Sequence, residues 1–301
     1  MHVIPSGSAT HSLGARVTGV DLTRPLTHAD FGTILRALGR HKVLCFPDQL
    51  LTPVQLRELS ARFGELQILP TSLFNEPGVP EVSILSNVVE NGKPIGAADA
   101  GQSWHTDMSY NALPLIGFVN ILVAHAVPVR AGQPLGGTEF TDVETAYAEL
   151  PADLKTRLAD ARAVHDWAMY WDMMRAKGSN RPALTPAQRA QHPPVEHPVF
   201  MTHPVSGNKV IYVNPGFTSR IVGMDAAESA AVLEALFAHV FQARYRHTHH
   251  WSVGDVLLWD HIGTWHNAIA DYTPAEARLM KRCQVMADKI LDPAFVAAAL
   301  A

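Results

Sequence analysis

The chain has 301 residues, of which 47% are hydrophobic, and its formal net charge is −4. This length allows one large domain or two average ones. We find no basic stripe of the kind that binds nucleic acid and no apolar run of about 20 residues that would span a membrane, and we expect no signal peptide. The two cysteines, Cys45 and Cys283, are too few for a disulfide framework, so we expect small core residues in a cytoplasmic protein.

The first half of the chain carries mainly strand patterns. Residues 1–50 have the pattern of short strands with turns, including a buried strand at Val43–Phe46. A helix is expected over Thr52–Phe63, because Thr52 can cap it and Pro53 suits its first turn. Further strands are expected at Val82–Asn87, Leu115–Val127 and Gly137–Thr141, with a loop over Glu90–Ser103 and short helices over Val143–Leu150 and Ala152–Ala161.

The second half contains one irregular stretch and one clear amphipathic helix. The segment Trp167–Pro194 has no clean period, and we expect a mobile lid or an insertion, with a plain surface linker as the alternative. Asp225 and Glu228 form a capping-box pattern before an apolar helical face that runs to Phe241. Strands are expected at Lys209–Val213, Asp255–Trp259 and Leu279–Met286.

Many short strands with a few inserted helices indicate a mainly β fold whose core is a double-stranded β-helix, or jelly roll. Because strands and helices do not alternate regularly, a doubly wound parallel sheet is disfavoured. We expect a single domain over residues 1–301, with the lid or insertion near 167–194.

The sharpest local signal is the motif Trp104-His105-Thr106-Asp107. Residues two apart in an extended segment point the same way, so His105 and Asp107 present an imidazole and a carboxylate on one face. A distant histidine, His266, completes the two-histidine, one-carboxylate set that non-haem Fe(II) oxygenases use, with three positions left open. Arg278 follows His266 by twelve residues, at the start of a predicted strand, where it can bind the far end of a dicarboxylate.

Further segments match a known family in the same order along almost the whole chain. They are Gly14–Val17 with Val20–Leu26, Arg62–Leu66, Trp104–Asp107, Gly136–Phe140, Thr202–Gly207, Val213–Thr218 and Trp259–Arg282. On these motifs the sequence resembles the family of taurine dioxygenase and 2,4-dichlorophenoxyacetate dioxygenase, which are Fe(II)- and 2-oxoglutarate-dependent oxygenases.

The resemblance implies a role for each site residue. The iron ligands are His105, Asp107 and His266, the residues that hold 2-oxoglutarate are Thr138 and Arg278, and the residues around the substrate are Arg282, as anchor of an anionic group, with Trp167, Phe217 and Leu69. The implied reaction uses O2, hydroxylates a small carboxylate, sulfonate or sulfate ester, and releases succinate and CO2. The resemblance also implies a homo-oligomer, either a dimer or a tetramer.

The substrate residues leave alternatives open. Trp167 and Phe217 can equally be ordinary core aromatics. Leu69, Ser72 and Gly101 replace polar residues of the taurine enzyme, so taurine is disfavoured and a substrate with an apolar body is expected.

Two rival functions and one histidine cluster complete the picture. The rivals are a non-catalytic jelly-roll protein that binds a small anion, and a zinc hydrolase, which would not need an arginine for a dicarboxylate. Instead of binding the substrate, Arg282 can form a salt bridge at the rim of the active site. His247, His249 and His250 precede Trp251, and we expect a solvated hairpin tip there, with a second metal site as the alternative.

Overall fold

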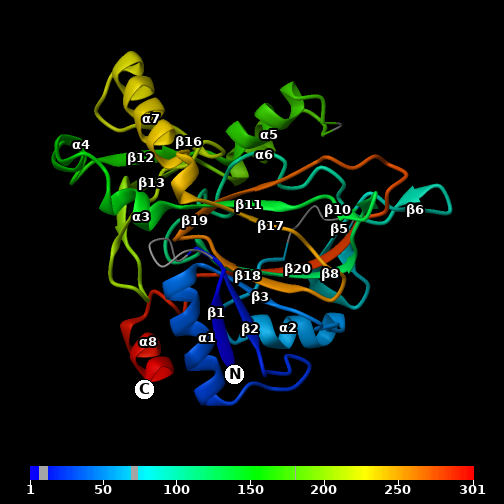
Figure 1. Ribbon diagram of the computed structural model, residues 1–301. Coiled ribbons are helices and arrows are strands. Elements are labelled where there is room, and N and C mark those ends of the chain that lie inside the picture. Colours follow the sequence, from blue (N-terminus) through cyan, green and yellow to red (C-terminus); the bar gives the residue numbers. More distant parts are fainter. Residues whose placement is uncertain (7–12, 69–73, 180) are drawn as a thin grey trace.

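The largest sheet of the computed structural model has eight strands and runs through the middle of the molecule (Figure 1). The structure describes residues 1–6, 13–68, 74–179 and 181–301. The strand order is β1 (His2–Pro5), β2 (Ala15–Thr18), β3 (Val43–Phe46), β18 (Val256–Asp260), β8 (Gly117–Ala126), β20 (Leu279–Met286), β5 (Val79–Ser86) and β4 (Asn75–Glu76). Neighbours are antiparallel except β2 and β3, which run parallel.

A second sheet of three strands packs on one face of the large sheet (Figure 1). Its order is β17 (Arg246–His249), β11 (Thr138–Asp142) and β19 (Thr264–Ala268). The ring centroids of Phe140 in β11 and Trp259 in β18 are 5.6 Å apart, and Leu122, Leu257 and Met280 belong to the same buried cluster between the sheets. Because neighbouring strand residues face opposite sides, every second residue of β18 and β20 points into this inter-sheet space.

The opposite face of the large sheet is covered by α1 (His28–His41) and α2 (Pro53–Ala61) (Figure 1). The helix α2 confirms the one predicted there, and its Thr52 forms a capping box with Gln55. The helix α1 contradicts the expectation of only short strands and turns over residues 1–50.

Two glycines lower the helix propensity of α1 but do not break its helical period. The buried apolar residues of α1 include Phe31, Ile34, Leu35 and Leu38, which share one helical face. Glycine lowers helix propensity, but packing requires it here. A Cβ at Gly32 would lie 2.4 Å from the carbonyl oxygen of Ala299 in α8 (Pro293–Leu300), and a Cβ at Gly39 would lie 2.5 Å from Val205. Close helix packing therefore outweighs the local propensity.

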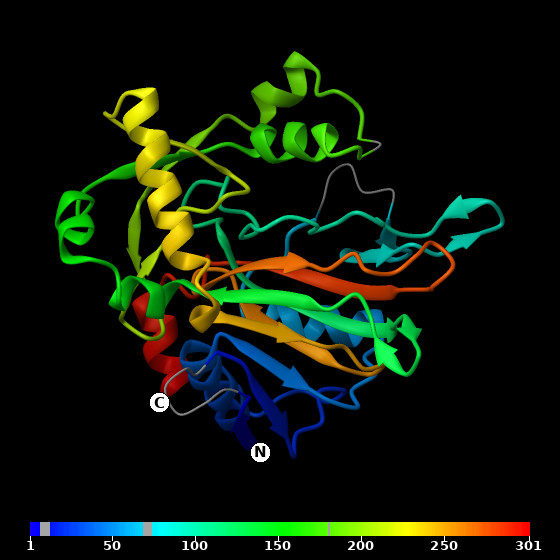
Figure 2. The same cartoon turned by 45° about the horizontal axis from the view of Figure 1, so that its top comes forward.

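A further layer lies on the far side of the small sheet (Figure 2). It contains α4 (Ala152–Arg157), β12 (Arg162–His165), α5 (Trp167–Ala176), α6 (Pro186–Gln191), β13 (Val195–Pro198), β16 (Thr218–Ile221) and α7 (Ala226–Val240). The helix α3 (Val143–Ala148) and the strands β14 (Phe200–Thr202) and β15 (Lys209–Ile211) lie instead beside α1, where Val205, between β14 and β15, packs against Gly39. The irregular stretch expected over 167–194 therefore holds two helices. Asp166 caps α5, and Thr185 forms a capping box with Gln188 at the start of α6, a local signal that the sequence does carry.

The other predicted elements are found with small shifts at their ends. The strands predicted around β3, β5, β8, β11, β15, β18 and β20 and the helices α3, α4 and α7 are all present. Asp225 caps α7 by accepting from the backbone of Glu228. The predicted loop over 90–103 overlaps a short hairpin of β6 (Val89–Glu90) and β7 (Lys93–Pro94), and β9 (Val129–Arg130), β10 (Gln133–Pro134) and the 3-10 helix η1 (Ala243–Tyr245) complete the list.

Both cysteines are free thiols, as expected, with Cys283 buried and Cys45 half-buried. None of the helices in the described ranges has the length and apolar character that a bilayer span requires.

Candidate active site

The two predicted histidine ligands lie directly opposite each other. His105 is in the loop before β8, and His266 is in β19. They form an isolated antiparallel bridge in which each backbone N–H donates to the carbonyl oxygen of the other, at 3.1 and 2.8 Å. Their ring centroids are 4.2 Å apart. Backbone pairing, rather than side-chain flexibility, therefore sets the spacing of the two imidazoles.

Asp107 completes a cluster of three possible metal ligands. The Nε2 atom of His105 is 3.2 Å from Oδ1 of Asp107, and Nε2 of His266 is 3.8 Å from its Oδ2. The ligand atoms of all three residues lie within 4.8 Å of one another. An octahedral ion with ligand bonds of about 2.1 Å holds adjacent ligand atoms about 3 Å apart. The three donors therefore fit one face of such an ion.

Charge and burial give Asp107 and His266 the protonation states that a cation requires. Burial raises the pKa of Asp107, but the contact with His105 and the charge of Arg282 outweigh it and hold this pKa well below its usual value. Burial, together with the neighbouring His105, holds the pKa of His266 well below its usual value. The site therefore presents a carboxylate and neutral imidazole rather than competing protons.

Hydrogen bonds orient the ligand side chains. The Nδ1 atom of His105 donates to the Ser103 carbonyl oxygen at 2.6 Å, an arrangement typical of metal-binding histidines, and this leaves Nε2 toward Asp107. The Oδ2 atom of Asp107 accepts from Nδ2 of Asn120 and from Nη1 of Arg282, both at 3.4 Å. The carboxylate thus has fixed partners on the side away from His105.

A buried carboxylate shapes the turn that leads to His266. Oδ1 of Asp260 accepts from the backbone N–H groups of Ile262 and Gly263, at 2.7 and 3.1 Å. Oδ2 accepts from Nε2 of His203, and both of these side chains are fully buried. The turn between β18 and β19 is therefore closed around one charged group.

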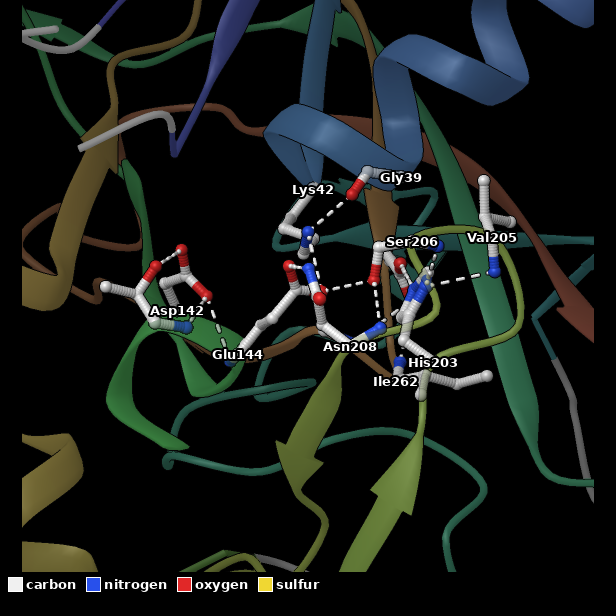
Figure 3. Close-up of polar contacts among 12 residues, drawn as sticks. Gly39, Lys42, Asp142, Glu144, His203, Val205, Ser206, Asn208 and Ile262 are labelled. Carbon is white, nitrogen blue, oxygen red and sulfur yellow. Dashed lines mark hydrogen bonds and ion pairs between the residues drawn. The ribbon is translucent and has the colours of Figure 1, made fainter. Parts of the chain in front are cut away.

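Figure 3 shows the polar network, including His203, between this turn and Lys42 at the end of α1. The Nδ1 atom of His203 accepts from the backbone N–H groups of Val205 and Ser206, at 3.2 and 3.1 Å, so the ring proton is on Nε2, facing Asp260. Beside it, Nζ of Lys42 lies 3.0 Å from the carboxylate of Glu144, which also accepts from Oγ of Ser206 at 2.6 Å. The backbone N–H of Asp260 in turn donates to the Lys42 carbonyl oxygen at 2.9 Å. The network links the helix layer to the turn that leads to His266.

The two residues predicted to hold 2-oxoglutarate flank one end of the inter-sheet space. Thr138 begins β11, and its Oγ1 accepts from Nε1 of Trp251 at 3.1 Å, which leaves the hydroxyl proton of Thr138 available to an anion. Arg278 is 7% exposed and lies beside Tyr272, and its Nε has no hydrogen-bond partner among the described residues. A buried guanidinium with an unused N–H is costly until an anion binds it.

The predicted substrate residues divide into two groups. Arg282 contacts Asp107, and the ring of Phe217 lies 6.0 Å from that of His105, so both adjoin the triad. Trp167 lies at the edge of the same aromatic cluster but makes its ring contacts with Trp171 and His192, at 5.2 and 4.6 Å. Leu69 and Ser72 lie outside the described residues.

Two tyrosines adjoin the triad that were not predicted. The ring of Tyr170 in α5 lies 5.1 Å from that of His105, and its buried hydroxyl has no partner in the described part of the chain. Tyr110 packs 4.8 Å from Phe217, and burial raises its pKa to about 12. Tyr110 follows Asp107 by three residues, which is the signal that could have indicated it. Tyr170 lies one helical turn after Trp167, but this relation was missed because the segment was not predicted to be helical.

The geometry agrees with a family match over nearly the whole chain. The sequence model of the taurine catabolism dioxygenase TauD, TfdA family matches residues 5–284. The chain belongs to this family. It is accordingly a 2-oxoglutarate-dependent dioxygenase.

Individual family members cover the chain almost completely. Pentalenolactone F synthase of Streptomyces avermitilis is 30% identical over 298 residues, which are 94% of this chain and 94% of the relative. The alpha-ketoglutarate-dependent 2,4-dichlorophenoxyacetate dioxygenase of Cupriavidus pinatubonensis is 29% identical over 92% of this chain and 96% of its own. The alpha-ketoglutarate-dependent sulfate ester dioxygenase of Pseudomonas putida is 31% identical over 90% and 85%.

The fold of this dioxygenase also matches solved structures. The crystal structure of AAD-2 in complex with Mn(II) and N-oxalylglycine superposes with a TM-score of 0.78 at 26% identity, over 95% of this chain and 97% of that one. The mainly-sheet architecture with inserted helices is therefore that of TauD-like dioxygenases.

Proposed function

We propose that this dioxygenase hydroxylates a small organic acid with an apolar body, with Fe(II) on His105, Asp107 and His266. In this proposal the two sheets form a double-stranded β-helix core, and the segment 167–194 is a lid or insertion over its open end. When bound, Fe(II) with 2-oxoglutarate and O2 supplies the oxidising power, so that the cosubstrate ends as succinate and CO2 and one oxygen atom enters a C–H bond. The protein binds, orients and shields these groups.

The donor set supports iron at the triad. Two imidazoles and one carboxylate on one face, with separations of 3.2 and 3.8 Å between ligand atoms, are what a facial three-ligand site needs. A tetrahedral zinc site with a single open position would leave no role for the buried, unpaired Nε of Arg278. The chemistry of the residues present therefore favours an ion with several open positions and a dicarboxylate partner.

Thr138 and Arg278 are proposed to bind the distal carboxylate of 2-oxoglutarate. Arg278 offers its unpaired Nε–H group, and Thr138 offers its hydroxyl proton because Trp251 already donates to its oxygen. Charge-assisted hydrogen bonds in a water-poor site are the strong ones. Together these residues orient the cosubstrate toward the metal face.

Arg282 and the aromatic rings support an acidic substrate with an apolar body. Arg282 is 13% exposed and its Nε has no hydrogen-bond partner in the described ranges, although its Nη1 already contacts Asp107. Phe217, Tyr170 and Tyr110 supply apolar walls beside it. Relatives whose names specify 2,4-dichlorophenoxyacetate or sulfate esters act on acids of this kind. The observation that carries the proposal is the unpaired Nε–H group of Arg282 beside the triad.

The test is succinate formation with a panel of candidate acids and their neutral amides or esters. We expect acids to turn over best, and Arg282→Ala to raise KM for the acid far more than KM for 2-oxoglutarate. Iron affinity is measured in parallel, because Arg282 also contacts Asp107. Lys281→Ala is the matched control, since Lys281 lies on the same strand and pairs with Glu76 at 2.7 Å.

Two results would count against the proposal. A neutral compound that is the best substrate would remove the role of Arg282, although the iron chemistry would stand. No succinate with any compound, and tight binding of an acid without turnover, would instead favour a non-catalytic anion-binding protein.

A further inference from the structure

A second group of metal-ligating side chains lies at one edge of the inter-sheet space. Cys45 is in β3, His249 ends β17, and Asp255 immediately precedes β18. Their ligand atoms lie within 4.8 Å of one another. The side chain of His249 is only 11% exposed and that of Asp255 only 8%, so the solvated hairpin tip expected at His249 is wrong. Cys45 is half-buried, which leaves an approach from solvent.

The contact between His249 and Asp255 lacks the alignment of an ordinary hydrogen bond. Nε2 of His249 lies 3.2 Å from Oδ2 of Asp255, yet this nitrogen has no hydrogen-bond partner among the described residues. Oδ2 already accepts from the backbone N–H of Ser252 at 2.8 Å. A tetrahedral ion with ligand bonds of about 2.0 Å holds nitrogen and oxygen ligands about 3.3 Å apart. The separation of the two atoms is therefore that of two ligands of one ion, and no hydrogen bond within the described residues uses this nitrogen.

We propose that Cys45, His249 and Asp255 bind a divalent cation of the zinc class, with water as the fourth ligand. Binding converts the Cys45 thiol to a thiolate and releases its proton to solvent. Thiolate and carboxylate then carry two negative charges, which match the cation, and the imidazole is neutral. A thiolate with one imidazole selects a softer ion than the two imidazoles and one carboxylate of the triad. Without a metal, burial raises the pKa of Cys45 to about 12, so the thiol keeps its proton. A bound cation would instead favour the thiolate.

The position of this site suggests what the cation would do. Cys45 and Asp255 belong to the large sheet and His249 to the small one, so the ion would join the two sheets. His249 pairs with Thr138 in the strand register, and its ring packs edge-on against Trp251 at 4.7 Å. Trp251 is the residue that donates to Thr138. The cation would therefore help to hold Thr138, which is proposed to bind 2-oxoglutarate, in place. Binding of the cation does not depend on that proposal.

Cobalt(II) is the probe, because a thiolate ligand gives a near-ultraviolet charge-transfer band that the triad, which has no sulfur, cannot give. The protein carries His105→Ala so that the triad is weakened. We expect a charge-transfer band at one equivalent of cobalt, which zinc displaces. The band should persist in Cys283→Ser, the matched control for the second cysteine, and disappear in Cys45→Ser. Zinc affinity should fall at least 100-fold in Cys45→Ser.

Thermal unfolding gives a second measurement on the same proteins. One equivalent of zinc should raise Tm in the His105→Ala background and leave Tm unchanged when His249→Ala is added. His249→Ala also serves if Cys45→Ser does not fold. A cobalt band that is missing in the background protein, or one that survives in both Cys45→Ser and His249→Ala, would overturn the proposal. The three residues would then form only an ion pair with a neighbouring thiol.

Discussion

Gly136 leaves no room for a side chain beside Arg278. A Cβ at Gly136 would lie 2.9 Å from Nε and 3.0 Å from Cδ of this arginine. The glycine also adopts a φ of +68°, a conformation that L residues rarely take. The side chain of Arg278, which is proposed to hold 2-oxoglutarate, can therefore take this position only because Gly136 has no Cβ.

Gly136→Ala should weaken 2-oxoglutarate binding by displacing Arg278. We expect the dissociation constant to rise by up to about 100-fold, on the scale of the loss in rate that a 1 Å misplacement can cause at an active site. Calorimetric titration of 2-oxoglutarate into anaerobic, metal-loaded protein measures it. Gly132→Ala is the control, because Gly132 has a φ of +78° but a Cβ there meets nothing within 4 Å. Equal losses in both variants would mean that backbone strain, not Arg278, is responsible.

Replacement of either histidine ligand should abolish turnover while the fold persists. We expect His105→Ala and His266→Ala to lose more than about 100-fold in succinate formation at limiting iron, since even indirect partners of metal ligands cost 10- to 100-fold. Circular dichroism checks the fold, and iron titration checks the cause. His28→Ala, at the exposed start of α1, is the control. Full activity of His105→Ala at limiting iron would contradict the assignment of the triad.

Asp260→Asn should destabilise the turn that leads to His266. The carboxylate accepts from His203 on one oxygen and from two backbone N–H groups on the other. An amide must turn its NH2 group toward one of these donors, so one contact becomes a clash between donors. We expect a loss of about 3 kcal/mol in unfolding free energy and weaker iron binding. Urea unfolding and iron titration test this, and an unchanged iron affinity would show that the turn does not depend on Asp260.

His165 should make the protein less stable in mild acid. Burial, aided by the nearby His197, lowers the pKa of His165 to about 3, whereas an unfolded histidine titrates near 6.5. Between these values the unfolded chain binds a proton that the folded protein excludes. Stability therefore falls as pH falls from about 6.5, by at most about 1.4 kcal/mol per pH unit for this residue.

His165→Phe should reduce this acid sensitivity. The ring stacks on Tyr212 at a centroid distance of 5.7 Å, and phenylalanine keeps that contact. Urea unfolding at pH 5, 6 and 7 should give a shallower slope for the variant than for the natural protein. Identical slopes would show that other groups carry the acid dependence.

The sequence predicted what depends on local pattern. The cap at Thr52, the strand Leu279–Met286 and the pair His105 and Asp107 all rest on neighbouring residues, and each is found where expected. The helix α1 was missed although its apolar residues recur at helical spacing and Thr27 caps it. Its Gly32 and Gly39 obey tertiary packing rather than helix propensity.

Contacts between distant segments were predicted only where a known ligand set required them. His266 was expected beside His105 and Asp107, and the three residues do come together. The contact between Arg282 and Asp107, which are 175 residues apart in the chain and 3.4 Å apart in space, was not predicted. The grouping of Cys45 with His249 and Asp255 likewise depends on the pairing of three strands, which no local motif indicates.

The strand order of the large sheet has a consequence for how the chain reaches this structure. β18 lies between β3 and β8, and β20 lies between β8 and β5. The earlier strands therefore cannot complete their hydrogen bonding until the chain up to Met286 is available. Such non-local pairing predicts slow folding. A chain truncated before Val256 would expose the open edges of β3 and β8, which are templates for pairing with other chains, so such fragments should aggregate rather than fold.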